Sequence, residues 1–93
     1  ILMTLNDTQK RISSICDDVK ELLLFKNQRY GNSALEPIRV FSKSSSVEQI
    51  LVRIDDKLNR IMKGVGLVED DEDVVMDLIG YLILLKMALE NEK

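Results

Sequence analysis

Two aspartates one helical turn apart, Asp73 and Asp77, are the side chains of this sequence best suited to chemistry. Asp77 interrupts a nearly continuous apolar run over residues 74–89, and a helix that is apolar all round is buried on several sides. A spacing of four places Asp73, Asp77 and Tyr81 on one face of that helix. Because burying an unpaired carboxylate is costly, the site must supply a positive charge or keep the acid protonated. The neutralising group therefore decides what this site does.

Lysine and arginine side chains are the first source of positive charge. Arg53, Lys57 and Arg60 recur at i, i+4 and i+7, so they form a basic ridge on one side of a predicted helix. Lys26 continues the apolar stripe of an earlier predicted helix, where it is either a snorkelling stem or an ammonium directed into a polar pocket. A salt bridge from one of these four cations to Asp77 would account for the aspartate without any ligand.

A divalent metal ion, Mg²⁺ in the first place, is the second source of positive charge. Asp73 and Asp77 would be its principal ligands. Facing helices offer three further carboxylates, those of Glu48, Asp55 and Glu21. Mg²⁺ usually binds one or two protein carboxylates and leaves its other positions to water and substrate phosphates. Basic side chains beside the metal would then bind phosphate oxygens. The residue types alone leave the salt bridge and the metal site both open.

The apolar periodicity predicts an all-α fold with three main helices, at residues 7–29, 47–63 and 72–90. The middle helix has an apolar stripe at spacings of three and four, made of Val47, Ile50, Leu51, Ile54, Leu58 and Ile61. An ordered loop is expected between the first two helices, because residues 31–45 have no sustained period and contain glycine, proline and several serines.

The sequence also marks the helix starts and the anchoring of the loop. Asn6 with Gln9 and Ser46 with Gln49 are each spaced as a capping box. Acids at residues 69–72 would offset the positive end of the dipole of the last helix, and Asp70 or Asp71 would cap that helix. Three apolar side chains are expected to hold the loop against the core: Ile38, Val40 and Phe41.

Composition indicates one small domain over residues 1–93, near the lower limit for a self-sufficient core. Apolar residues make up 45% of the chain, and there is no Trp, so Leu, Ile, Val and Met must form the core. A fully apolar helix in so short a chain predicts that another subunit covers part of it, in a homodimer or homotetramer.

Charge and residue types exclude several functional classes. A net charge of −3 argues against a dedicated DNA- or RNA-binding protein. The absence of histidine excludes imidazole bases and most zinc sites. The single cysteine, Cys16, lies on an apolar stripe and is predicted to be a reduced core residue of a cytoplasmic protein. No signal peptide or membrane span is visible, and Met3 could be the natural start, with Ile1 and Leu2 added upstream.

Four segments carry a resemblance: KNQRYGNS at residues 26–33, FSK at 41–43, VRIDDKLNRI at 52–61 and DLIGY at 77–81. With these segments the chain resembles, over about residues 20–90, the small phage and bacterial proteins of the nucleotide modification associated domain family. That family is more distantly similar to the all-α nucleoside triphosphate pyrophosphatases of the MazG and dimeric dUTPase type.

The resemblance implies a helical oligomer that uses Mg²⁺ to cleave nucleoside triphosphates to monophosphates and pyrophosphate. Its metal ligands form an E-x-x-E motif on one helix and an E-x-x-D motif on a later one. Asp77 matches the last acid of the second motif, and Asp73 lies one residue from its first position. The first motif falls on the middle helix, where no second acid follows Asp55 or Asp56 at the required spacing.

The resulting hypothesis is a nucleotide-handling protein, in its catalytic form a Mg²⁺-dependent pyrophosphohydrolase of NTPs or dNTPs. The carboxylates assigned to catalysis are Asp55, Asp73 and Asp77, and those assigned to the metal are Glu48, Asp73 and Asp77. The side chains assigned to the nucleotide phosphates and base are Lys26, Tyr30, Arg53, Lys57, Arg60 and Tyr81. Two alternatives stay open. One is a non-catalytic protein that sequesters a nucleotide or is the partner of a phage nucleotide-modification or counter-defence system, in the host cytoplasm. The other is a purely structural oligomer.

Overall fold

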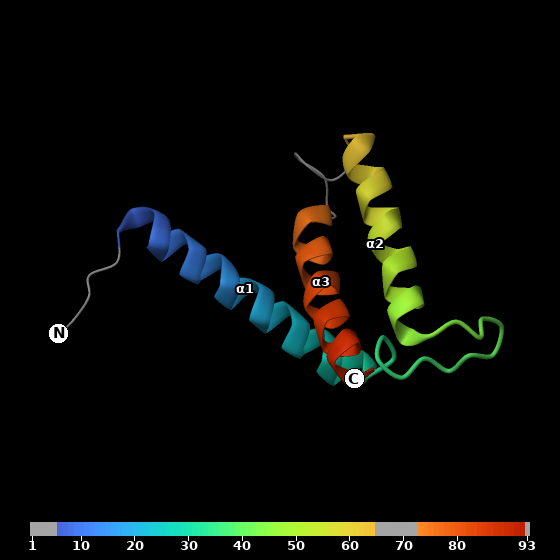
Figure 1. Cartoon of the computed structure of the whole chain (residues 1–93). Helices are drawn as coiled ribbons and strands as arrows, with labels where there is room; N and C mark the ends of the chain where they lie inside the picture. Colours follow the sequence, from blue (N-terminus) through green and yellow to red (C-terminus); the bar gives the residue numbers. More distant parts are fainter. Residues whose placement is uncertain (1–5, 65–72, 93) are drawn as a thin grey trace. The chain divides into compact units, whose positions relative to one another are not determined.

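The computed structural model describes residues 6–64 and 73–92, and every regular element in this part of the chain is an α-helix (Figure 1). In chain order the helices are α1 (Asp7–Tyr30), α2 (Ser46–Met62) and α3 (Val74–Asn91). The all-α prediction is confirmed, and each helix begins and ends within two residues of its predicted bounds. The chain divides into two compact units, Ile1–Gly31 and Asn32–Lys93. The prediction of one domain over the whole chain stays a prediction.

The first unit contains α1, whose two ends are fixed by local hydrogen bonds. The Asn6 side chain accepts a hydrogen bond from the Gln9 backbone N–H at 2.8 Å, and the Gln9 side chain accepts one from the Asn6 N–H at 2.9 Å. This confirms the predicted capping box. At the other end Gly31 has φ 70°, which glycine adopts without steric cost, and its N–H donates to the Asn27 carbonyl. Cys16 is exposed, so the prediction of a core cysteine is wrong.

The second unit is built on an antiparallel hairpin of α2 and α3, which run side by side (Figure 1). Its core consists of Ile50, Ile54 and Ala88, all buried. Further apolar side chains pack against this core: Leu35, Val47, Leu78, Tyr81, Leu84 and Leu85. These contacts follow from the spacing of three and four along both helices, which keeps one stripe of each facing the other.

The seam of α2 differs from its predicted apolar stripe at three positions. Leu51 and Leu58 were expected in the core but are exposed, whereas Lys57 is buried. The reason is the narrow contact of a two-helix hairpin. The seam follows Val47, Ile50, Ile54 and Lys57 at alternating spacings of three and four, and Leu51 and Leu58 lie on the side of it opposite Lys57, where water reaches them.

Two helix starts also differ from prediction by one or a few residues. Ser45, not Ser46, caps α2, because the Ser45 hydroxyl accepts a hydrogen bond from the Glu48 N–H at 3.2 Å. The predicted cap of α3 within residues 69–72 lies outside the described residues. Asp73 is the N-cap of α3 as the structure has it, and it accepts a hydrogen bond from the Met76 N–H at 2.9 Å.

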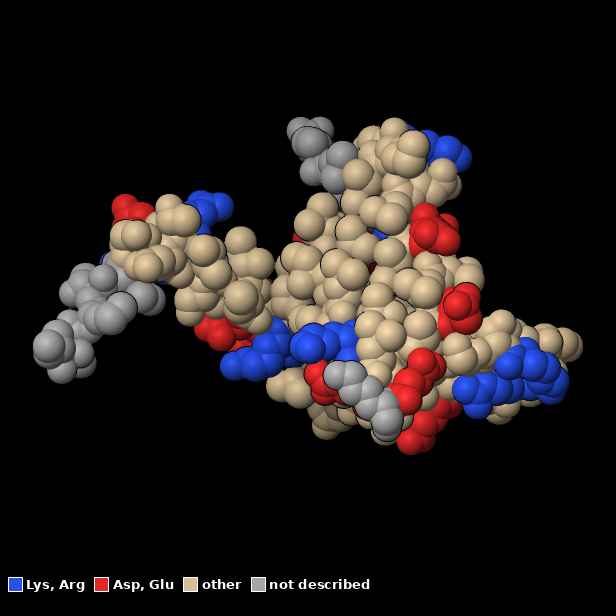
Figure 2. Space-filling view, viewed as in Figure 1, with Lys and Arg blue, Asp and Glu red and all other residues tan. Residues whose placement is uncertain are grey.

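The loop between α1 and α2 is held by polar contacts of its own. Leu35 packs on the hairpin core, but Ile38, Val40 and Phe41 are exposed, so the prediction that these three anchor the loop is wrong. Arg39 has φ 56° and donates from Nε to the Ser44 carbonyl at 3.1 Å, and Lys43 Nζ donates to the Arg39 carbonyl at 2.7 Å. Figure 2 shows Lys and Arg side chains gathered where this loop projects from the hairpin. Hydrogen bonds from Arg39 and Lys43 therefore hold the loop, in place of the apolar contacts that were predicted.

None of the helices that the structure describes has an apolar stretch long enough to cross a membrane.

Candidate functional site

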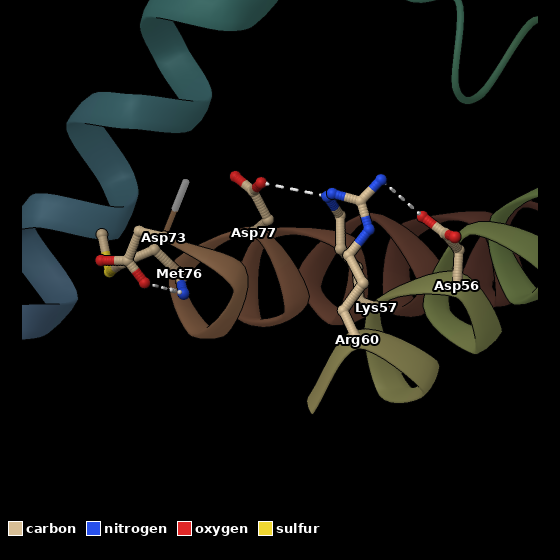
Figure 3. A network of polar contacts seen from close by, with 6 residues as sticks. All are labelled: Asp56, Lys57, Arg60, Asp73, Met76 and Asp77. Carbon is tan, nitrogen blue, oxygen red and sulfur yellow. Dashed lines mark hydrogen bonds and ion pairs between the residues drawn. The ribbon is translucent and has the colours of Figure 1, made fainter. Parts of the chain in front are cut away.

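An ion pair between the two helices of the hairpin is the centre of the candidate site (Figure 3). Lys57 Nζ of α2 lies 3.3 Å from Asp77 Oδ2 of α3. The Lys57 side chain is 11% exposed and that of Asp77 is 21% exposed, so both charges are largely removed from water. Coulomb attraction is stronger there than at the surface, because the local dielectric constant is lower. The aspartate inside the apolar run is therefore paired with a cation from the neighbouring helix.

The position of this pair follows from the periodicity of both helices. Lys57 comes three residues after Ile54, at a spacing where α2 would otherwise place an apolar core residue. Asp77 lies in the first turn of α3, next to core residue Leu78, and the positive end of the helix dipole stabilises its carboxylate. The lysine stem extends through the apolar seam, and its ammonium reaches the carboxylate at the edge of the core.

Arg53 and Arg60 extend the positive charge along α2. Each lies within about one helical turn of Lys57, and the three cations form a basic ridge on one side of the helix. Arg60 Nη2 is 3.4 Å from Asp56 Oδ2, in a pair that is more open to water than the pair at Lys57 (Figure 3). Arg53 is exposed. The basic ridge thus has one member fixed in the seam and two that reach solvent, of which Arg60 is paired with Asp56.

Asp73 lies in a different environment from the one predicted. It was expected to continue the acidic face into the buried body of α3, but it is exposed and caps the helix (Figure 3). Its Oδ1 accepts the hydrogen bond from Met76, as the N-cap position requires. Asp73 and Asp77 therefore have different structural roles. One satisfies the helix end, and the other neutralises Lys57.

The carboxylates predicted to bind Mg²⁺ are not gathered by the described residues of one chain. Glu48 and Asp55 are exposed on α2, Asp73 is committed to the helix cap, and Asp77 faces Lys57. Within residues 6–64 and 73–92, no three Cys, Asp or Glu side chains are grouped closely enough to hold a metal ion. The described residues do not bring the predicted ligands together, and the magnesium cofactor stays a prediction.

The remaining predicted site residues lie in two environments. Lys26 and Tyr30 belong to α1 in the first unit, where both are exposed and the guanidinium of Arg29 lies 5.6 Å from the centre of the Tyr30 ring. Tyr81 packs against the hairpin core and is partly buried. Phe41, which the sequence assigned to the core, is 98% exposed. The proline and serines around it were the signal that could have indicated an exposed aromatic ring.

Comparison of the chain with protein-family models, with curated proteins and with solved structures found no match in any of the three.

Proposed function

We propose that this protein binds a phosphorylated nucleotide through the basic ridge of α2, formed by Arg53, Lys57 and Arg60. The observation that carries the proposal is the position of Lys57, which Asp77 holds at the edge of the core with an arginine on either side along the helix. Guanidinium groups bind phosphate oxygens in pairs of parallel hydrogen bonds, and a fixed ammonium between them adds a point charge. The resemblance to nucleotide-handling proteins supports the same ligand class, and such a ligand is available in the cytoplasm.

Binding without hydrolysis is the form of the proposal that the geometry favours. Hydrolysis of a triphosphate by this type of protein would need a metal-activated water, and the carboxylates assigned to the metal are dispersed in the described part of the chain. Catalysis by a Mg²⁺-dependent pyrophosphohydrolase therefore stays a separate hypothesis, which the release of pyrophosphate tests.

Calorimetric titration of the full chain with NTPs and dNTPs, with and without Mg²⁺, tests binding directly. We expect Arg53→Gln to weaken nucleotide affinity about tenfold or more, because a charge-assisted hydrogen bond to phosphate is lost. Arg53 is exposed, so its replacement should leave the hairpin folded. Lys20→Gln is the matched control, since it removes one positive charge from an exposed ion pair on α1. Absence of binding for every nucleotide, or equal losses in the two variants, would contradict the proposal.

Asp73→Asn separates the binding and hydrolysis hypotheses. Asparagine is as good an N-cap as aspartate, so α3 should keep its stability while the negative charge is lost. Under the binding proposal, the variant binds nucleotide as the wild type does and neither protein releases pyrophosphate. If the wild type releases pyrophosphate with Mg²⁺ and Asp73→Asn does not, the carboxylate acts on the metal and the hydrolase hypothesis is correct.

A structural role is the second candidate function, and the placement of Lys57 at a core spacing favours it. A single polar residue in a helical seam can fix the register of the two helices at some cost in stability. In that case Lys57 and Asp77 only align the hairpin, and neither Arg53→Gln nor any added nucleotide changes the thermal stability.

A further inference from the structure

The side of α3 that faces away from α2 carries a second apolar surface. At about 100° per residue, the α3 side chains that pack on α2 centre on one face, and a second group lies about 180° from it. This outer groove, with a volume of about 440 Å³, is lined by Ile79, Leu82, Ile83, Lys86, Met87 and Glu90. Leu82, Ile83 and Met87 are each between 41% and 49% exposed. The last helix is thus apolar on two opposite faces, of which α2 covers one.

The hairpin buries few apolar side chains, so an additional apolar face exposed to water is unfavourable for its stability. Its core cluster contains three buried residues, Ile50, Ile54 and Ala88. Small units of this kind usually need oligomerisation or a covalent or metal staple to be stable. The described residues hold no group of ligands for a metal, and the sequence has a single cysteine. The outer groove is the apolar face of α3 that α2 leaves uncovered, so covering it would bury more apolar surface.

The charges at the outer groove indicate what covers it. Its two charged lining residues, Lys86 and Glu90, are of opposite sign and form an ion pair at 3.2 Å, so the groove has no net charge. The whole chain has a net charge of −3, so two copies that met through acidic surfaces would repel each other. An apolar surface without net charge is complementary to itself, which is the requirement for a two-fold symmetric interface.

We propose that two copies of this chain associate through the outer grooves of their α3 helices, so that the two hairpins form a four-helix bundle. In such a bundle each α3 contacts its own α2 on one face and the partner helix on the other. Ile83, in the middle of the groove, lies near the two-fold axis. The proposal is independent of the nucleotide site, since the basic ridge of α2 and the outer groove of α3 share no residue.

Sedimentation velocity of the full chain, from roughly 1 to 100 μM, tests this interface. The wild type is expected to sediment as a dimer in the upper part of that range, within the affinities usual for such complexes. Ile83→Glu should weaken association by roughly 100-fold or more, because each copy would bury an unpaired carboxylate at the interface. Met62→Glu is the matched control, since it adds the same charge at a highly exposed position near the end of α2.

Far-ultraviolet circular dichroism shows whether each variant keeps its helices. If Ile83→Glu does not fold, Met87→Gln replaces it, with an expected loss of about tenfold, because an uncharged amide costs less to bury than a carboxylate. A wild type that is monomeric at roughly 100 μM would overturn the proposal and leave the groove to another segment or another protein. A dimer that persists in the folded groove variants, or one that Met62→Glu disrupts equally, would overturn it as well.

Discussion

At the scale of single residues, the ion pair of Lys57 and Asp77 accounts for the main irregularity of the sequence. An aspartate inside an apolar helix requires a positive partner, and the structure supplies it from the seam of the adjacent helix at 3.3 Å. The salt bridge was one of the two arrangements that the residue types left open, with the metal site as the other. Arg53 and Arg60 lie outside this pair, and Arg60 forms an ion pair of its own with Asp56.

The contribution of this pair to stability can be measured with a double-mutant cycle. Asp77→Asn alone should lower the free energy of unfolding by about 2 kcal/mol, because the lysine keeps its charge in a largely buried position. Combining Asp77→Asn with Lys57→Met should recover much of that loss, since the lysine charge is removed together with its partner. Urea unfolding gives the four free energies of the cycle.

The exposed pair of Asp17 and Lys20 on α1 is the control for that cycle. Both side chains are more than 60% exposed, so Lys20→Met should change stability by less than about 0.5 kcal/mol. If Asp77→Asn lowered the free energy of unfolding as little as Lys20→Met and the cycle gave no coupling energy, the pair would neither stabilise the hairpin nor position Lys57 for a site.

At the scale of elements, local hydrogen bonds set where each helix begins. Asn6, Ser45 and Asp73 all accept a hydrogen bond from the N–H three residues later. The predicted capping box at Asn6 was confirmed. The predicted cap at Ser46 is wrong by one residue. Ser45 and Ser46 have the same side chain, and Ser45 is the cap because its backbone is extended whereas that of Ser46 is already helical. Asp73, which the sequence assigned to the metal, is by the same local chemistry the N-cap of α3.

The two serines give a direct test of this assignment. Ser45→Ala should destabilise the protein by about 1 kcal/mol, because the Glu48 N–H loses its acceptor. Ser46→Ala should be neutral or slightly stabilising, since Ser46 is the first residue of α2 and alanine has the higher helix propensity. Chemical unfolding of both variants gives the comparison, and a larger loss for Ser46→Ala would place the cap at Ser46.

At the scale of the whole molecule, the small core of the hairpin and the apolar outer groove of α3 both point to association. A folded dimer is coupled to concentration by mass action, so its melting temperature rises as the protein is concentrated. We expect the melting temperature of the wild type to rise with protein concentration. For Ile83→Glu we expect a lower melting temperature that does not change with concentration. Differential scanning fluorimetry over a 100-fold range of roughly 1–100 μM measures both. A melting temperature independent of concentration in the wild type would contradict a coupled dimer.

The sequence by itself determined the helices and the need for a positive partner at Asp77. Periodicity gave three helices because one face of each must be apolar, and the isolated Asp77 required a cation because a buried charge must be compensated. Both inferences depend on residues close together in the chain.

Only the tertiary structure decided which cation pairs with Asp77 and which apolar side chains are buried. Arg53, Lys57 and Arg60 share one side of α2, and the contact between α2 and α3 brings Lys57 to Asp77. The same narrow seam leaves Leu51 and Leu58 in water. These outcomes depend on how two helices pack, and the periodicity of one helix does not contain that information.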